Sequence, residues 1–186
     1  MTTSASTLPA APATGIGRLY AARAAFAIVW AAIVLAVAPT EISVPVGILL
    51  VLYPVYDLVG IATDARLGGG LAGRPDLVLN LAVSGAAAIA LVVATTSGVP
   101  AVLRVWGAWA VVSGLTQLSV AVRRRAVGGQ LPLILSGAIS VLAGGGFVAM
   151  AGGDDPSVSG VGGYALLGGL FFLASSILLR RRNRKA

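Results

Sequence analysis

The sequence contains no cysteine and no histidine, and only 10% of its 186 residues are charged. Without cysteine there can be no disulfide and no thiolate chemistry. Without histidine the chain lacks the side chain that most often titrates near neutral pH, and the two absences together exclude a typical zinc site. We therefore expect no metal and no cofactor, and any response to acid would have to depend on carboxylates.

The scarcity of charge reflects a strongly apolar composition. Hydrophobic residues make up 58% of the chain, and its mean hydropathy is +0.96. A soluble domain of this size needs far more charge to keep its surface hydrated, so we expect the lipid bilayer to be its solvent. The formal charge of +7 does not indicate nucleic acid, because the basic clusters border apolar segments and lack interleaved aromatic residues.

Six apolar stretches are long enough to cross a hydrocarbon core, which takes about 20 residues. They predict an all-α fold, a polytopic bundle of transmembrane helices near 20–38, 43–63, 77–95, 100–122, 131–150 and 160–179. The first stretch has an alternative, because a basic region before an apolar run is also typical of a signal peptide. The run from Ala24 to Thr40 is longer than the usual signal-peptide core, so we favour a span.

Twelve of the thirteen basic residues lie in four clusters, at every second gap between the apolar stretches. The clusters are Arg18 with Arg23, Arg66 with Arg74, the arginines at 123–125, and the arginines at 180–182 with Arg184 and Lys185. Cytoplasmic loops retain Lys and Arg, so both termini are predicted to be cytoplasmic. One lysine against twelve arginines, in a chain rich in Ala, Gly and Val, is typical of a GC-rich bacterium. We expect a multi-pass protein of the bacterial cytoplasmic (inner) membrane.

The same pattern divides the chain into three helical hairpins, near 18–66, 74–125 and 130–182. A disordered cytoplasmic tail is predicted at 1–17, where Thr, Ser, Ala and Pro are frequent, and a short basic cytoplasmic tail at 183–186. A bundle of six short helices has little interior of its own, which is consistent with a homo-oligomer.

Short motifs recur in the second, fourth and sixth apolar stretches. The motif residues are Tyr53 with Asp57, Trp109 with Ser113 and Gly114, and Tyr164 with Gly168 and Gly169. The tripeptide Ser84-Gly85-Ala86 also recurs as Ser136-Gly137-Ala138. Since equivalent helices run the same way, we predict three parallel copies of one hairpin, unlike the inverted repeats of many transporters.

Glycines spaced seven residues apart share one helix face. They occur as Gly107 with Gly114, Gly137 with Gly144, and Gly162 with Gly169. Because small residues let helix backbones approach each other, these faces are predicted to be helix–helix contacts.

The repeated motif resembles the short repeat of HdeD-like membrane proteins. In that repeat an aromatic residue is followed by small or apolar residues, then by Asp or Ser with Gly, and finally by an apolar run into basic residues. The match is best from Gly107 to Arg125 and from Ser136 to Ile139, whereas the first copy has Leu58 in place of glycine and Pro54 within the helix. The resemblance covers about residues 20–182. It implies a non-enzymatic protein of envelope stress or acid resistance, and it transfers no catalytic residue.

Polar side chains within the spans are the candidates for function, because charge inside a membrane is costly. Asp57 is the only acid well inside a predicted span, roughly 9 Å from its cytoplasmic end by helix geometry. Roughly 5–8 Å from the same face we place Arg23, Asn80, Gln117, Ser175 and Ser176. This cluster is either a vestibule or proton-responsive switch centred on Asp57, or a structural network that holds the first four helices together. We favour the structural interpretation.

Three functions follow from these observations. The first, favoured by the resemblance, is a non-enzymatic membrane stress protein whose protein partner is unknown. The second is a small channel or permease for protons or a small solute, with a path near Asp57. The third, an enzyme, is disfavoured because no span carries His, Cys or paired carboxylates. The pair Asp154-Asp155 could bind a cation, but the adjacent Pro156 and glycines favour a solvated turn.

Overall fold

The chain folds into six long α-helices. The structure, a computed structural model, describes residues 13–37 and 41–184. The helices are α1 (Ala13–Val37), α2 (Val44–Leu67), α3 (Pro75–Ala94), α4 (Val99–Arg123), α5 (Leu131–Met150) and α6 (Ser159–Asn183), with a short 3-10 turn, η1 (Arg125–Val127), after α4. The described residues contain no strand, and all six helices are long and apolar enough to cross a membrane. The predicted all-α bundle of six spans is confirmed.

Proline and glycine mark where the helices begin and end. α2, α3, α4 and α5 each have proline within their first two positions, where the missing N–H would have no helical partner. The connection from α2 to α3 contains three glycines with positive φ, Gly69, Gly70 and Gly73. Residues that carry a Cβ rarely adopt a positive φ, so glycine permits the tight turn there.

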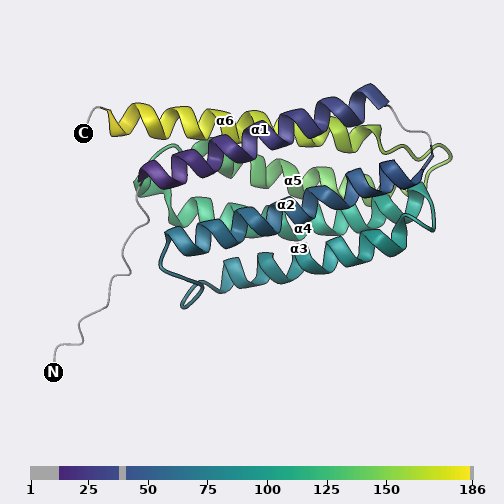
Figure 1. The fold of residues 1–186 in the computed structure, drawn as a ribbon, viewed down its shortest axis with the longest axis horizontal. Coiled ribbons are helices and arrows are strands. Elements are labelled where there is room, and N and C mark those ends of the chain that lie inside the picture. The colour runs from purple at the N-terminus through teal and green to yellow at the C-terminus, as the bar shows by residue number, and fades with distance from the viewer. Residues whose placement is uncertain (1–12, 38–40, 185–186) are drawn as a thin grey trace.

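The helices alternate in direction, which places the basic clusters at one end of the bundle, apart from Arg23, which lies about 15 Å from the start of α1. The start of α1 and the ends of α2, α4 and α6 lie together (Figure 1), and we call this the arginine end. Glu41, Asp154 and Asp155 lie in connections at the opposite end. The arginine end is the cytoplasmic side by the positive-inside rule, which remains a prediction.

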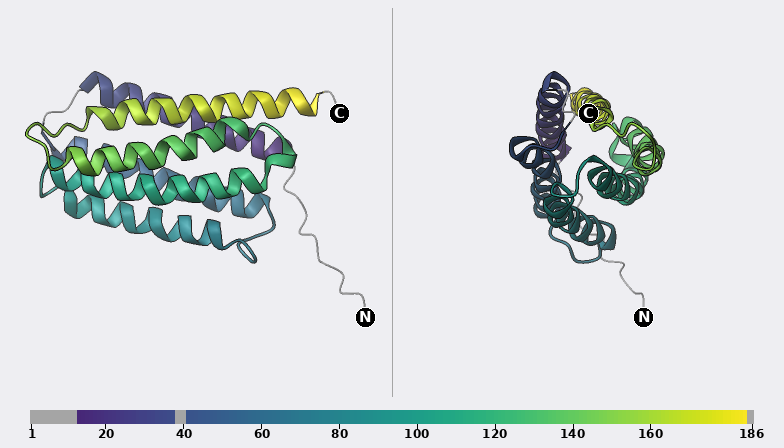
Figure 2. Two further views of the ribbon diagram at one scale, coloured as in Figure 1. Left: turned by 180° about the vertical axis from the view of Figure 1, so that it is seen from behind. Right: turned by 90° about the vertical axis from the view of Figure 1, so that its right-hand side faces the viewer.

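The helices follow one another around the bundle and close it between α6 and α1. Figure 2, in its end-on view, shows α1 and α6 side by side. Packing is most extensive between α4 and α5 and between α1 and α6. Contacts between successive predicted hairpins are therefore at least as extensive as those within them.

Glycines account for the close approach of α4 and α5. A Cβ on Gly107 would lie 2.6 Å from the carbonyl oxygen of Gly144, and one on Gly114 would lie 2.9 Å from that of Gly137. Only hydrogen fits at these positions. On α6, Gly169 packs in the same way against α1. The spacing of seven residues predicted these contacting faces, and they are confirmed.

The interior away from the arginine end is apolar and aromatic. Trp30 and Trp106 stack there with ring centroids 5.6 Å apart, and neither is more than 2% exposed. Leu50, Leu91 and Leu103 belong to the same buried cluster. We call these five residues the apolar plug.

Two predicted boundaries are corrected. Residues 13–17, predicted as part of a disordered tail, are the first residues of α1, because Ile16 is buried with Tyr20 and Leu179 and this burial extends the helix. Asn183, predicted as tail, is the last residue of α6. The remainder of the N-terminal tail (1–12), Lys185 and Ala186 lie outside the described residues.

Candidate functional site

An ion pair lies near the middle of the bundle. Arg23 on α1 donates to the carboxylate of Asp57 on α2, and their side chains are 19% and 7% exposed. Because α2 continues to Leu67, Asp57 lies about 15 Å from the end of its helix, deeper than the predicted 9 Å. A charge at this depth needs a partner, and each member of the pair supplies one to the other.

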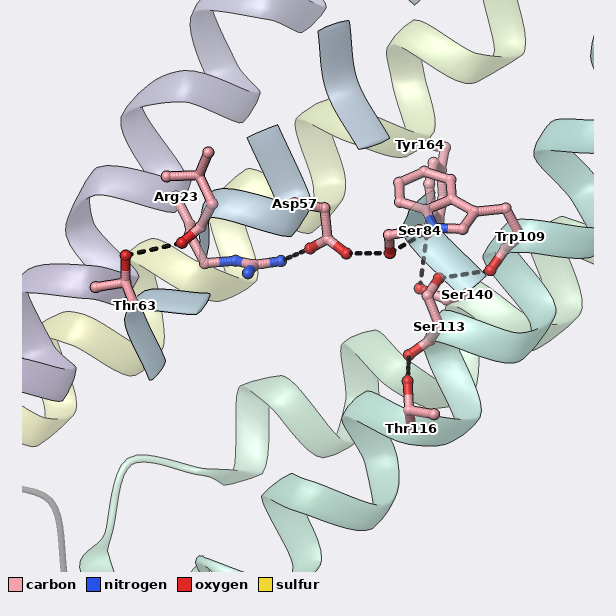
Figure 3. Close-up of polar contacts among 10 residues, drawn as sticks. Arg23, Asp57, Thr63, Ser84, Trp109, Ser113, Thr116, Ser140 and Tyr164 are labelled. Atoms are coloured by element: carbon pink, nitrogen blue, oxygen red, sulfur yellow. Dashed lines mark hydrogen bonds and ion pairs between the residues drawn. The ribbon is translucent and has the colours of Figure 1, made fainter. Parts of the chain in front are cut away.

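The same carboxylate is joined to two further helices through a serine. Ser84 on α3 donates its hydroxyl to Asp57 Oδ2 at 2.7 Å, and Trp109 Nε1 on α4 donates to Ser84 Oγ at 3.0 Å. Figure 3 shows this line of contacts running from the indole through the hydroxyl and carboxylate to the guanidinium. It connects α1, α2, α3 and α4, but through Ser84 and Trp109, which were not in the predicted cluster. The predicted Gln117 donates instead to the backbone carbonyl of Leu133 at 3.1 Å.

A shorter polar connection joins α5 and α6 beside this line. Tyr164 on α6 donates to Ser140 Oγ at 3.1 Å (Figure 3). Ser140 donates in turn to the backbone carbonyl of Ser136 at 2.8 Å. Ser113 on α4 donates to the carbonyl of Trp109 at 2.6 Å. Every helix of the bundle thus places a polar side chain near the axis.

These side chains surround a small axial cavity, which we call the deep chamber. Its volume is about 50 Å³, and all six helices line it. Its lining includes seven of the eight predicted motif residues, namely Tyr53, Asp57, Trp109, Ser113, Gly114, Tyr164 and Gly168. The eighth, Gly169, packs against α1 instead. The three motifs, separated in sequence, thus converge on one cavity.

A second cavity, the outer chamber, lies between the deep chamber and the arginine end. Its volume is about 60 Å³, and its lining again comes from all six helices. The two chambers share four residues, Arg23, Asn80, Gln117 and Phe172. The Arg23 guanidinium carbon lies 4.7 Å from the centroid of the Phe172 ring, a cation–π distance. The chambers are therefore stacked along the axis and meet at Arg23.

Asp64, in the lining of the outer chamber, is a site residue that the sequence analysis missed. Arg124 donates to both of its carboxylate oxygens, at 2.8 and 2.6 Å, and Arg74 donates at 3.3 Å. Burial lowers the pKa of Arg124, but the hydrogen bonds with Asp64 and its negative charge raise that pKa by more. The net pKa of Arg124 is therefore above its ordinary value. The guanidinium therefore stays charged. The predicted end of the second helix at 63 had placed Asp64 in a loop, although its seven-residue spacing from Asp57 indicates one helix face.

The predicted polar cluster divides into two groups. Arg23, Asp57, Asn80 and Gln117 line the deep chamber together. Ser175 and Ser176 line neither chamber; both are buried, and Ser176 donates to the carbonyl of Gly17 at 2.8 Å. The reason is helical spacing: Ser176 follows Gly169 by seven residues and shares the face of α6 that packs on α1.

The fold and the chambers define a class, a six-helix integral membrane protein with a polar axial interior. Among the residues that the structure describes, no group of three or more Asp or Glu side chains is placed to hold a metal ion. No protein-family model, no curated protein and no solved structure matches the chain.

Proposed function

We propose that this chain is a non-enzymatic integral membrane protein of the HdeD-like kind, which acts in envelope stress or acid resistance in a bacterial inner membrane. The motifs from Gly107 to Arg125 support the family, and the arginine clusters support the orientation. The observation that carries the proposal is the axial network, in which both lining carboxylates, Asp57 and Asp64, are neutralised by arginine.

This network suits a scaffold better than a catalytic site. A general acid or base must be free to exchange a proton with a substrate. Here Asp57 accepts from Arg23 and Ser84, while Asp64 accepts from two arginines. Side-chain hydrogen bonds between membrane helices contribute about 0.6 kcal/mol each, so the network holds neighbouring helices in register.

Acid survival tests the proposal. Cells that lack the chain would be compared with cells that carry the wild type, Asp57→Asn, or the control Gly145→Val, because a Cβ on Gly145 would meet no atom within 4 Å. We expect the wild type and the control to raise survival and Asp57→Asn to raise it less. Equal survival with and without the wild-type chain would refute the proposed function. Wild-type survival with Asp57→Asn would show that this carboxylate does not read the acid signal.

A channel or permease for protons or a small solute is the second candidate, because the two chambers meet at the ion pair. The apolar plug, with Trp30 and Trp106, opposes it, since the polar lining does not continue through that half of the bundle. Purified protein in liposomes that enclose a pH-sensitive dye would separate the candidates. We expect no proton flux above that of empty liposomes, and a flux abolished by Asp57→Asn would favour the permease.

A further inference from the structure

We infer that the two chambers form one water-filled vestibule that is open to solution at the arginine end alone, passes the Arg23–Asp57 pair and ends in the deep chamber. Water, and protons carried by it, are the ligands of this site. The inference concerns access to the buried pair, and it holds or fails independently of the stress function proposed above.

The first support is a buried oxygen in the chamber linings that has no hydrogen-bond partner among the described residues. Asn80 Oδ1 is buried and accepts no hydrogen bond from the described residues, although it lines both chambers. Each chamber exceeds the roughly 10–15 Å³ that one water requires. A buried water also needs two to four polar partners. Arg23, Asn80 and Gln117 line both chambers and supply donors and acceptors.

The second support is the position of the outer chamber. Asp64 lies about 4.5 Å from the end of α2, and Ala121 and Leu133 are each about 3 Å from a helix end on the same side. The lining therefore reaches the last turns of the helices at the arginine end. The Arg23 side chain is 19% exposed; it borders both chambers and also a smaller cavity beside Phe26 and Tyr56.

The third support is the apolar plug, which closes the deep chamber on the side away from the arginine end. Tyr53 and Trp109 line the chamber and also contact the plug, since both rings pack against Trp106 at centroid distances of 5.4 and 5.1 Å. Leu50 and Leu103 are completely buried beyond them. The one polar atom of the plug without a hydrogen-bond partner in the described residues is the buried Nε1 of Trp106, and the aliphatic side chains packed around it offer water no second partner. The plug therefore opposes access from the opposite end.

The ion cluster of Asp64 with Arg124 lies at the mouth of the vestibule. Arg124 follows α4 and reaches α2, so its two hydrogen bonds join the end of α4 to Asp64, which lines the outer chamber near the end of α2. We call the Asp64–Arg124 pair the latch, because it narrows the opening so that only water and small ions pass. Loosening it would widen the entrance without altering the Arg23–Asp57 pair.

Few titratable groups face this space. The chamber linings contribute Tyr20 and Arg23 from α1, Tyr53, Asp57 and Asp64 from α2, and Tyr164 from α6, whereas α3, α4 and α5 contribute uncharged side chains. The two aspartates are the only acids in these linings. Protons entering from the arginine end would therefore meet Asp64 first and Asp57 last.

The absence of cysteine makes a direct test available, since any introduced thiol is unique. Asn80→Cys places a thiol where the chambers meet, and Ser136→Cys places one in the deep chamber with little change of size. Ala165→Cys is the matched control, because this residue is completely buried in the apolar cluster. Arg184→Cys reports which vesicle face carries the arginine end.

Silver ion, small enough to follow water, would be added to sealed vesicles of either orientation in chloride-free buffer. Free thiol would then be counted after denaturation. We expect Asn80→Cys and Ser136→Cys to lose their free thiol when silver reaches the arginine end, and Ala165→Cys to keep it. Protection of both chamber thiols, or their modification from the opposite side, would overturn the vestibule. Thermal unfolding of each variant verifies that the bundle is intact.

Adding Arg124→Gln to Asn80→Cys tests the latch. We expect a faster loss of the free thiol than in Asn80→Cys alone, and still from the arginine end only. An unchanged rate would remove the latch from the proposal. These measurements do not depend on acid survival, so the vestibule and the stress function can fail separately.

Discussion

Replacement of Asp57 by asparagine probes the interior of the bundle most directly. The substitution removes the negative charge but keeps an oxygen that can still accept from Ser84. Arg23 then keeps its charge without a counter-ion, and the new amide directs donors toward a guanidinium that can only donate. The protein should remain folded but be substantially less stable.

The magnitude follows from the burial of the pair. Breaking a buried ion pair by removing one partner costs about 3–5 kcal/mol. Because the Arg23 side chain is 19% exposed and the chambers admit water, we expect the lower end, about 3 kcal/mol. Removing both charges is different, because apolar replacement of a whole ion pair is often neutral or stabilising. The double variant Arg23→Met with Asp57→Leu should therefore recover most of the stability lost by Asp57→Asn.

Reversible unfolding in mixed micelles, titrated with a denaturing detergent, measures these free energies. Ser84→Ala is a suitable control, since it removes no charge. It removes two hydrogen bonds, the one donated to Asp57 and the one accepted from Trp109, and at about 0.6 kcal/mol each it should cost about 1–2 kcal/mol. A variant Asp57→Asn as stable as the wild type would refute the reasoning. The reasoning would also be refuted if the double variant lost as much stability as Arg23→Met alone and Asp57→Leu alone lose together.

Three further predictions follow from the packing and the charges. Gly107→Val should separate α4 from α5 and lower the unfolding free energy by about 1–3 kcal/mol or more, because a Cβ at Gly107 meets backbone at 2.6 Å. Gly145→Val should be nearly neutral, because a Cβ there meets no atom within 4 Å. Equal melting temperatures of the two variants would contradict this. Arg124→Gln should destabilise the bundle more than Arg74→Gln, because only Arg124 contacts both carboxylate oxygens of Asp64. Thermal unfolding measures both variants, and a lower melting temperature for Arg74→Gln than for Arg124→Gln would contradict the geometry. A periplasm-dependent reporter fused after Ala186 should be inactive, and activity there would overturn the predicted orientation.

Local properties of the sequence were enough to predict the six helices and the gathering of the arginines at one end. Span length and hydropathy are read within a single segment, and the alternation of direction follows from the number of spans. The glycine spacing also identified the contacting faces correctly, because residues seven apart share a face in any α-helix. Asp57 and Arg23 could be selected because the bilayer makes isolated charges costly.

Only the tertiary structure decided which of these faces meet. Ser84 became the partner of Asp57, and Ser176 was turned toward α1, because each helix is rotated by the fit of its glycine and aromatic faces against both neighbours. The pairing of Asp64 with Arg124, 60 residues away, depends in the same way on the closure of the bundle. The chambers exist because six helices enclose one axis, and no single segment contains the information for that space.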